Sequence, residues 1–164
     1  MNTQKAYTLE EDQKFLEESI RLAKENINNG GGPFGAVIVK DHEVLATGCN
    51  RVTPNNDPTA HAEVMAIRAA CQKVQNFKLD GCVLYASCEP CPMCLSAIYW
   101  AGIERVVFAA DKHDAADAGF DDAFIYEELD KPMEERSIAT INLRTQSAAS
   151  PFDIWKKKDD KTPY

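Results

Sequence analysis

Two short sequences constrain this chain more than any other feature. His61–Glu63 reads HAE and Pro90–Cys94 reads PCPMC, and roughly thirty residues separate them. A histidine and two cysteines provide three ligands that zinc binds well. A structural zinc site normally has four protein ligands, whereas a catalytic site keeps three and leaves the fourth position for water. The pattern therefore indicates a catalytic zinc site with His61, Cys91 and Cys94 as its ligands.

Both halves of this pattern lie where helices are expected to begin. Apolar residues recur at helical spacing over residues 60–76, and Pro92 is well placed to start a second helix. The free N–H groups and the positive dipole end of a helix start favour thiolate over thiol. Glu63 can reach past its helix end toward the water that zinc activates. We expect Glu63 to be the general acid/base that moves protons between water and substrate.

Other interpretations of the cysteines remain open at this stage. Cys82 or Cys88 could supply a fourth ligand and make the zinc purely structural. The run Cys88–Cys94 also resembles part of an iron–sulfur motif, although the usual fourth cysteine followed by proline is missing. A third possibility is a zinc-stabilised interaction module with no enzymatic activity.

Composition narrows the class of protein. A chain of 164 residues is long enough for one domain, which we expect to span residues 1–164. A net charge of −8 disfavours a nucleic-acid partner, because backbone binding needs clustered Lys and Arg. No apolar stretch approaches the ~20 residues of a membrane span, and the polar start lacks the pattern of a secretory signal. We expect a cytoplasmic protein without membrane contact, whose six cysteines stay reduced.

Apolar periodicity and turn residues predict an α/β fold. A strand followed by a helix and a further strand implies parallel pairing through right-handed crossovers. Asp41 and His42 form a tight connection between two predicted strands, which favours a hairpin. The predicted strands are 34–40, 43–49, 82–86 and 105–110, with a possible fifth at 138–145, and the predicted helices are 9–28, 60–76, 92–101, a short one within 114–128, and 150–158.

Several segments carry a resemblance to a known family. Gly32–Val39, Asn56–Glu63 and Ser87–Cys94 resemble the cytidine-deaminase-like superfamily, whose zinc signature is the HAE and PCxxC pair. Asp117–Asp122 and the ending SPF…W…Y at 150–164 look like those of the small bacterial guanine deaminases within it. The resemblance implies a three-layer α/β/α sandwich around a mixed five-stranded sheet.

The same resemblance implies an activity and a set of site residues. Guanine would lose ammonia from C2 to give xanthine, with one Zn²⁺ per subunit activating the attacking water. Glu63 would carry protons, and Asp122 would contact the amino group as a second catalytic residue. The substrate-binding residues that the resemblance implies are Asn50, Phe34, Trp100, Ala62 and Tyr164.

The resemblance also implies a homodimer in which residues 146–164 are exchanged between subunits. Tyr164 would then cap the pocket of the partner, although the charged tail before it departs from the simple pattern. The residues alone leave other roles open: Asn50 could start a turn, Asp122 could cap a helix, and Trp100 could be a core residue. Cytosine, isocytosine, guanosine and adenosine in tRNA are the alternative substrates, and a basic rim for tRNA is not visible in this acidic chain.

Overall fold

The computed structural model describes residues 6–164, in which a four-stranded mixed sheet carries the site. The strands are β1 (Gly35–Lys40), β2 (Glu43–Cys49), β3 (Cys82–Cys88) and β4 (Arg105–Ala110). Their order across the sheet is β2-β1-β3-β4. β1 pairs antiparallel with both β2 and β3, whereas β3 and β4 are parallel. The predicted hairpin and the predicted parallel pair are therefore both present.

Two features of the sequence fix the centre of this sheet. Asp41 and His42 both take positive φ values, 50° and 67°, which are the values of a two-residue hairpin turn. All residues of β3 are buried, as expected for a strand covered on both faces. β3 therefore fixes the position of the segment that follows it, Glu89 to Cys91, at the carboxyl end of β3.

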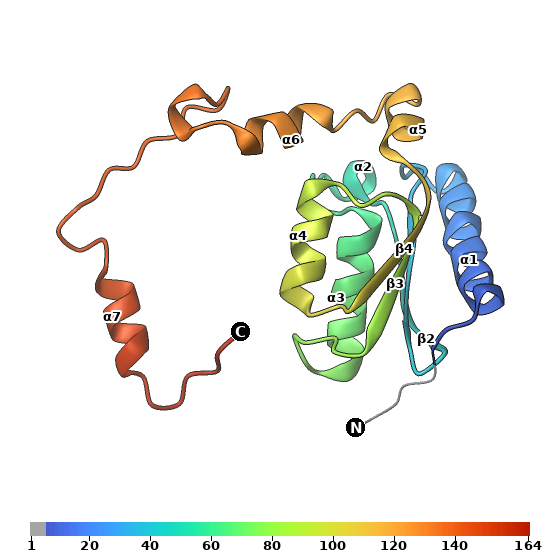
Figure 1. The fold of residues 1–164 in the computed structure, drawn as a ribbon, viewed down its shortest axis with the longest axis horizontal. Coiled ribbons are helices and arrows are strands. Elements are labelled where there is room, and N and C mark those ends of the chain that lie inside the picture. The colour runs from blue at the N-terminus through green and yellow to red at the C-terminus, as the bar shows by residue number, and fades with distance from the viewer. Residues whose placement is uncertain (1–5) are drawn as a thin grey trace. The chain divides into compact units, whose positions relative to one another are not determined.

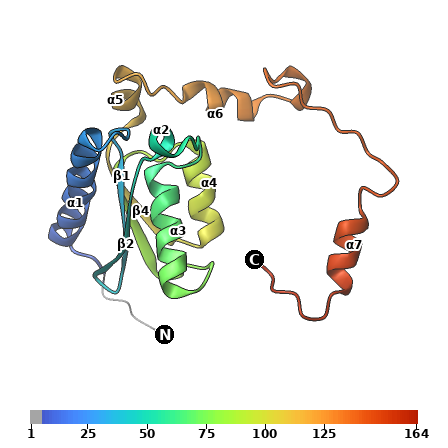
Figure 2. The ribbon, with the colours of Figure 1, turned by 180° about the vertical axis from the view of Figure 1, so that it is seen from behind.

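Helices cover both faces of the sheet and make three layers (Figures 1 and 2). α1 (Leu9–Asn28) packs on one face, and α3 (Ala62–Val74) and α4 (Pro92–Ala101) lie on the other. α1 begins with a capping box in which the Thr8 hydroxyl accepts from the Glu11 N–H and the Glu11 carboxylate accepts from the Thr8 N–H. Among the described residues, no helix is both long and apolar enough to cross a lipid bilayer.

Gly48 in β2 lets α3 approach the sheet closely. A Cβ at this position would lie 2.3 Å from the Ala62 carbonyl oxygen and 2.3 Å from the Ala66 nitrogen, so any larger residue would push the helix away. Ala62, Ala66 and Ala70 of α3 are fully or almost fully buried against the strands. This small-residue packing places the start of α3, with His61 before it, beside the end of the sheet.

Two short helices follow strand ends on the same side as the start of α3. α2 (Val52–Asn55) follows β2, and α5 (Lys112–Asp117) follows β4. Asp111 caps α5 by accepting from the N–H groups of His113 and Asp114. The loops around α2 and α5 supply most of the walls of the site described below.

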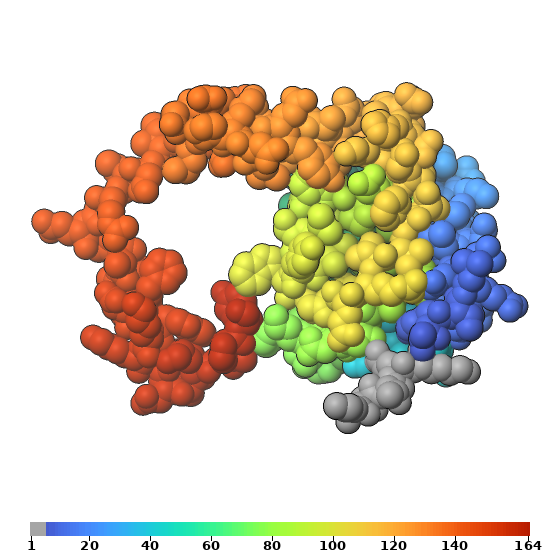
Figure 3. Space-filling model, viewed as in Figure 1, coloured from blue at the N-terminus to red at the C-terminus, as the bar shows by residue number. Residues whose placement is uncertain are grey.

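The chain divides into two units, one ending at Ala123 and one comprising residues 124–164. The second unit contains most of α6 (Ala123–Asp130), a 3₁₀ turn at Met133–Glu135, and α7 (Ser150–Lys157). None of its residues is buried in the single chain. Figure 3 shows the first unit as closely packed atoms, whereas parts of the second unit, orange to red, are a single thin chain.

The expected fifth strand is absent from the described residues, so the prediction of a five-stranded sheet was wrong in this detail. Residues 138–145 form no strand or helix. Their apolar side chains are exposed, with Ile141 at 85% and Leu143 at 83%. A β-strand exists only where its backbone pairs with a neighbour, and alternation of residue types cannot supply that neighbour. The single-domain prediction for residues 1–164 and the exchange of residues 146–164 stay predictions.

Candidate metal and substrate site

The three predicted zinc ligands converge at two helix starts. His61 is the N-cap of α3 and Cys91 is the N-cap of α4, and neither side chain caps its own helix by a hydrogen bond. Cys94 lies one turn into α4. The ligand atoms of His61, Cys91 and Cys94 all lie within 4.8 Å of one another. Because neither N-cap side chain forms a capping hydrogen bond, both can bind a shared ion.

Distances between the ligand atoms match the requirements of a tetrahedral zinc ion. His61 Nδ1 lies 3.5 Å from Cys91 Sγ and 3.5 Å from Cys94 Sγ. Zinc bonds of about 2.0 Å to nitrogen and about 2.3 Å to sulfur, at tetrahedral angles, separate the two atoms by roughly 3.5 Å. The donor set therefore fits zinc in both chemistry and spacing, and it leaves a fourth coordination position for a non-protein ligand.

Electrostatics at Cys91 and His61 support the same interpretation, whereas the hydrogen bond to Cys91 and burial raise the pKa of Cys94. Hydrogen bonds from Cys94 and from His61 lower the pKa of Cys91 to about 4, so this thiol ionises readily. The negative sulfur of Cys91 raises the pKa of His61 through the hydrogen bond between them. The thiolate is the form of cysteine that binds a metal ion, and here it lies beside a histidine that can be a second ligand.

The alternative in which Cys82 or Cys88 completes a structural zinc site is not supported by the geometry. The metal-ligand group found among the described residues contains His61, Cys91 and Cys94, without either of these cysteines. Cys82 lies at the opposite end of β3, and the Cys88 thiol donates instead to the carbonyl oxygen of Asp111 at 3.6 Å.

Glu63 is buried next to the metal ligands, with 8% of its surface exposed. It is the second residue of α3, two positions after His61, and it lines the same cavity. Burial raises the pKa of Glu63, because an apolar environment disfavours a carboxylate charge. A carboxyl group with a raised pKa, facing the place of a metal-bound water, can both accept and return a proton.

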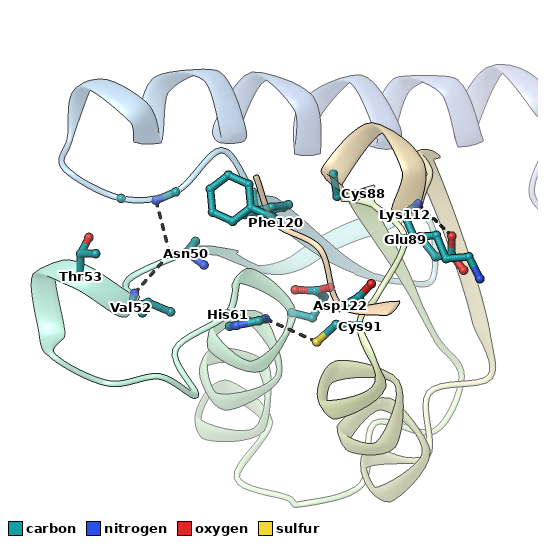
Figure 4. A pocket seen from close by; sticks show the side chains of 15 residues that line it. Asn50, Val52, Thr53, His61, Cys88, Glu89, Cys91, Lys112, Phe120 and Asp122 are labelled. Carbon is teal, nitrogen blue, oxygen red and sulfur yellow. Dashed lines mark hydrogen bonds between the residues drawn. The ribbon is translucent and has the colours of Figure 1, made fainter. Parts of the chain in front are cut away.

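A cavity of about 380 Å³ opens above these groups, and all of its lining residues belong to the first unit (Figure 4). Its volume is in the range of small-molecule sites. Asp122 lines the cavity, and burial followed by the charge of Cys91 raises the pKa of its carboxyl. Neighbouring Asp121 accepts from the Ala123 N–H at the start of α6. The acceptor at the start of α6 is therefore Asp121, whereas Asp122 lines the cavity.

Asn50 lies at the far side of the cavity from Cys91 in Figure 4, at the end of β2. It is 7% exposed. Its side-chain oxygen accepts from the N–H groups of Gly32 and Val52, at 3.3 Å each. A carbonyl oxygen has two lone pairs, so both are used. The group of the Asn50 side chain that is left for a ligand is therefore its NH₂ donor.

Two phenylalanines form an aromatic wall. Phe34 and Phe120 both line the cavity, and their rings meet edge to face with centroids 5.0 Å apart and an interplanar angle of 87°. Phe34 was a predicted substrate-binding residue. Sequence reasoning gave Phe120 no role, although Phe120 stands inside the DAGFDD segment, two residues before Asp122. A pattern search for aromatics beside the predicted acid could have found it.

Glu89 and Lys112 are further lining residues without a predicted role. The Glu89 carboxylate accepts from the backbone N–H of Lys112 at 3.1 Å, and the Glu89 N–H donates to the Ala110 carbonyl oxygen at 2.8 Å. These bonds join the PCPMC loop to the start of α5. The lining thus carries three carboxyl groups, those of Glu63, Glu89 and Asp122, with one lysine.

Three predicted substrate-binding residues do not line this cavity. Trp100 is 66% exposed on α4. Ala62 is buried, and its side chain packs in the core, so any substrate contact would come from its backbone at the start of α3. Tyr164 belongs to the second unit, where it lies with Phe152 and Trp155 around an apolar hollow. Their roles toward a substrate stay predictions.

Comparisons with known proteins agree with this site. The model for the cytidine and deoxycytidylate deaminase zinc-binding region matches residues 9–110. Guanine deaminase of Bacillus subtilis (strain 168) is 55% identical over 153 residues, which cover 93% of this chain and 98% of the relative. A tRNA-specific adenosine deaminase of Aquifex aeolicus is 44% identical over 96 residues, 58% of this chain and 64% of the relative.

Solved structures give the same relationships. The X-ray structure of guanine deaminase from Bacillus subtilis has a TM-score of 0.91 to this chain at 55% identity, covering 93% of this chain and 98% of that one. Guanine deaminase from Nitrosomonas europaea has a TM-score of 0.65 at 33% identity, covering 72% and 68%. The chain belongs to the family of zinc-binding cytidine and deoxycytidylate deaminases, as its HAE and PCPMC sequences predicted.

Proposed function

We propose that this protein hydrolyses guanine to xanthine and ammonia, with one zinc ion per subunit. The observation that carries the proposal is the group of His61, Cys91 and Cys94 at tetrahedral zinc spacing, with the buried Glu63 beside it in one cavity. The 55% identity to a guanine deaminase over nearly the whole chain supports guanine as the substrate among the amidine-bearing bases.

The chemistry needs proton transfer as well as a nucleophile. A bound zinc would act as a Lewis acid that lowers the pKa of its water to about 7. Glu63 would take a proton from the attacking water and deliver it to a ring nitrogen of the substrate next to C2. It would then pass the proton of the newly added hydroxyl to the amino group, whose bond to C2 breaks so that ammonia leaves and the C2 carbonyl of xanthine forms. Its raised pKa suits this task, because the carboxyl can hold the proton between the two steps. Asp122, in the same cavity, can accept a hydrogen bond from the leaving amino group.

The polarity of the cavity fits an uncharged purine. Three carboxyl groups accept hydrogen bonds from N–H groups, which the amino edge of guanine provides. The Asn50 amide donates to an acceptor on the opposite edge, and the Phe34–Phe120 wall contacts the ring. The same carboxyl groups would repel a phosphate. We therefore expect the free base, and not a nucleotide, to be the substrate.

We further propose that the protein is a homodimer that exchanges residues 146–164. Phe152 at 67% exposure and Ile154 at 70% are apolar residues with no core of their own. β4 is at the open edge of the sheet, where its outer backbone groups lack a strand partner within the described chain. Exchange would bury these residues and could bring Tyr164 and Trp100 to a pocket. A cytoplasmic location stays a prediction.

A substrate panel tests the proposed function. Purified, zinc-loaded protein is incubated with guanine, guanosine, GMP, cytosine, isocytosine, adenine and an adenosine-containing tRNA, and ammonia release is measured. We expect kcat/KM for guanine to exceed that for every other compound by about a hundredfold or more. Turnover of guanosine or of the tRNA without turnover of guanine would overturn the proposal. Equal zinc content without ammonia release from any compound would favour the non-enzymatic module.

A further inference from the structure

Asn26 is a buried polar residue that the zinc chemistry does not use. It lies in the last turn of α1, on the opposite face of the sheet from α3 and α4, and 3% of its surface is exposed. Burying an amide is costly unless its hydrogen bonds are made. The partners of Asn26 therefore indicate what this residue does.

Both partners of the Asn26 amide group lie at the rim of the cavity. Its Nδ2 donates to the carbonyl oxygen of Gly32 at 2.8 Å and to the carbonyl oxygen of Asn50 at 2.8 Å. Its backbone oxygen also accepts from the Gly31 N–H at 3.1 Å. One side chain thus ties the glycine loop after α1 to the end of β2, which is twenty-four residues away in the sequence.

These bonds fix both backbone polar groups, the N–H and the C=O, of the same two residues, Gly32 and Asn50. Asn26 holds the carbonyl of Gly32, while the N–H of Gly32 donates to the side-chain oxygen of Asn50. Asn26 also holds the carbonyl of Asn50, and the N–H of Asn50 donates to the Phe34 carbonyl oxygen at 3.1 Å. The backbone and the side chain of Asn50 are therefore fixed together, and its NH₂ group keeps one direction.

Gly31 has no room for a side chain, and the space at Gly32 is tight. A Cβ on Gly31 would lie 2.2 Å from the Asn50 carbonyl oxygen and 2.3 Å from Asn26 Nδ2. A Cβ on Gly32 would lie 3.2 Å from the Asn50 side-chain oxygen. The close approach of the loop to Asn26 and Asn50 thus depends on the glycines at 31 and 32.

We propose that Asn26 is a positioning residue for the substrate, which aligns the Asn50 amide so that a single N–H donor faces the purine. This inference rests on the proposed function for the identity of the substrate. Asn26 would act entirely through Asn50 and the glycine loop, since Asn26 itself does not line the cavity. The result would be selection for bases that present a hydrogen-bond acceptor at this edge.

The test uses full-length, zinc-loaded protein carrying Asn26→Asp. This change keeps the size of the side chain but replaces the NH₂ donor with oxygen, which cannot donate to two carbonyl groups. We expect KM for guanine to rise on the order of tenfold, with kcat changed about threefold or less, because the loss concerns binding more than proton transfer. Asn26→Ser, whose hydroxyl cannot bridge both carbonyls, should give the same result if Asn26→Asp does not fold.

Ser19→Ala provides the matched control. Ser19 is another fully buried polar residue of α1, but its hydroxyl donates to the Leu16 carbonyl oxygen within the same helix. We expect Ser19→Ala to lower the unfolding temperature somewhat without a change in KM. If Asn26→Asp lowers the unfolding temperature and leaves KM unchanged as Ser19→Ala does, Asn26 is a structural residue and the inference is wrong.

A double-mutant cycle tests whether Asn26 acts through Asn50. In the background of Asn50→Ala there is no side-chain amide to align, so Asn26→Asp should raise KM no further. Equal fold-changes in KM with and without the Asn50 amide would show independent effects and would overturn the inference.

A spectroscopic measurement separates this inference from the proposed function. In ¹⁵N–¹H spectra, we expect the side-chain NH₂ signals of Asn50 to shift or broaden in Asn26→Asp and to stay unchanged in Ser19→Ala. If the wild-type protein releases no ammonia from guanine, the proposed function fails while this measurement still decides the alignment of Asn50. Unchanged Asn50 signals in Asn26→Asp would reject the positioning role.

Discussion

Residues 6–123 and residues 124–164 differ in what their apolar side chains contact. In the first unit, β3 is buried along its whole length and α1, α3 and α4 each pack on a face of the sheet. In the second unit, α7 is as amphipathic in sequence as α1. Nevertheless, Phe152 of α7 is 67% exposed and Trp155 is 40% exposed. Local sequence signals are enough to form a helix in both units, but only the first unit contains the surfaces that bury one.

The two units also differ in which functional groups they contain. The first unit contains one cavity that is lined by His61, Cys91, Glu63, Asn50 and Asp122. The ligand atom of Cys94 lies within 4.8 Å of those of His61 and Cys91. The second unit contributes apolar groups that need another surface, including Tyr164 at 77% exposure. We infer that the first unit carries the chemistry, and that the second unit serves assembly and closure of the site.

The largest effect is expected from the loss of a zinc ligand in the first unit. Cys91→Ser should reduce bound zinc from about one ion per subunit to nearly none and abolish ammonia release, because serine is a poor zinc ligand. The unfolding temperature should also fall, since metal binding is coupled to folding. Elemental analysis and thermal unfolding measure both effects.

Cys71→Ser is the matched control for this prediction. Cys71 is half-buried in α3, and its thiol donates to the Phe77 carbonyl oxygen, away from the ligand group. Full zinc content and full activity are expected. Undiminished zinc in Cys91→Ser would show that the ion is held elsewhere.

The next effect concerns the second unit. Residues 138–145 lead into the exchanged segment 146–164, and we expect them to pair with the open edge of the sheet in the other subunit. Ile141→Asp should then convert the proposed dimer to a monomer, because this pairing would bury Ile141. Arg144→Asp changes a charge on the opposite side of the same alternating segment and should leave the dimer intact. Light scattering with size-exclusion chromatography gives the mass of each variant. A dimer in both variants would contradict the pairing of residues 138–145 with the other subunit, and a monomeric wild type would contradict the exchange of residues 146–164.

A smaller effect is expected at the end of the chain. Deletion of Tyr164 should raise KM for guanine several-fold if its side chain or carboxylate closes a pocket in the dimer. Tyr164→Phe keeps the ring and the terminal carboxylate and loses only the phenolic hydroxyl, so it shows whether that hydroxyl acts. Steady-state kinetics with guanine measure both variants. Identical KM values in wild type and deletion would exclude Tyr164 from the pocket.

The smallest effect is a dependence of stability on pH within the first unit. Hydrogen bonds from Arg105 and Tyr85 lower the pKa of Asp12. A carboxyl whose pKa is lower in the folded state stabilises the fold above its unfolded pKa of 3.8, and this contribution is lost as pH falls through the folded value. Asp12→Asn should lower the free energy of unfolding by about 1–3 kcal/mol at pH 7.

Urea unfolding at pH 7 and pH 3 measures this contribution. The difference in stability between Asp12→Asn and wild type should shrink at the lower pH, where the wild-type Asp12 begins to lose its charge. Glu17→Gln, an exposed carboxylate on the same helix, is the control and should have a negligible effect at both pH values. The same difference at both pH values would show that the Asp12 charge contributes nothing.

The sequence predicted the centre of the site well because its signals are local. The HAE and PCPMC sequences place ligands at helix starts, and a helix start has a fixed geometry that spacing reveals. The hairpin at Asp41 and His42 was equally readable from its two-residue turn. These features depend on a few neighbouring residues and little on the rest of the chain.

Features that depend on distant surfaces were harder to predict. Phe120 reaches Phe34 across eighty-six residues of sequence, and neither residue type indicates a cavity by itself. Residues 138–145 alternate like a strand, but no partner strand is supplied within the described chain. The predicted contact of Trp100 with substrate also depends on whatever surface covers α4. In each case the sequence showed the type of residue but not which strand, ring or surface it would contact.

The most direct test of the central claim is the zinc content and guanine turnover of Glu63→Gln. Glutamine keeps the size and shape of the side chain but cannot carry the proton. We expect one zinc ion per subunit, an unchanged circular dichroism spectrum, and ammonia release reduced by about a thousandfold or more. Turnover within tenfold of wild type, with zinc fully retained, would contradict the assignment of Glu63 as the proton carrier of a zinc deaminase.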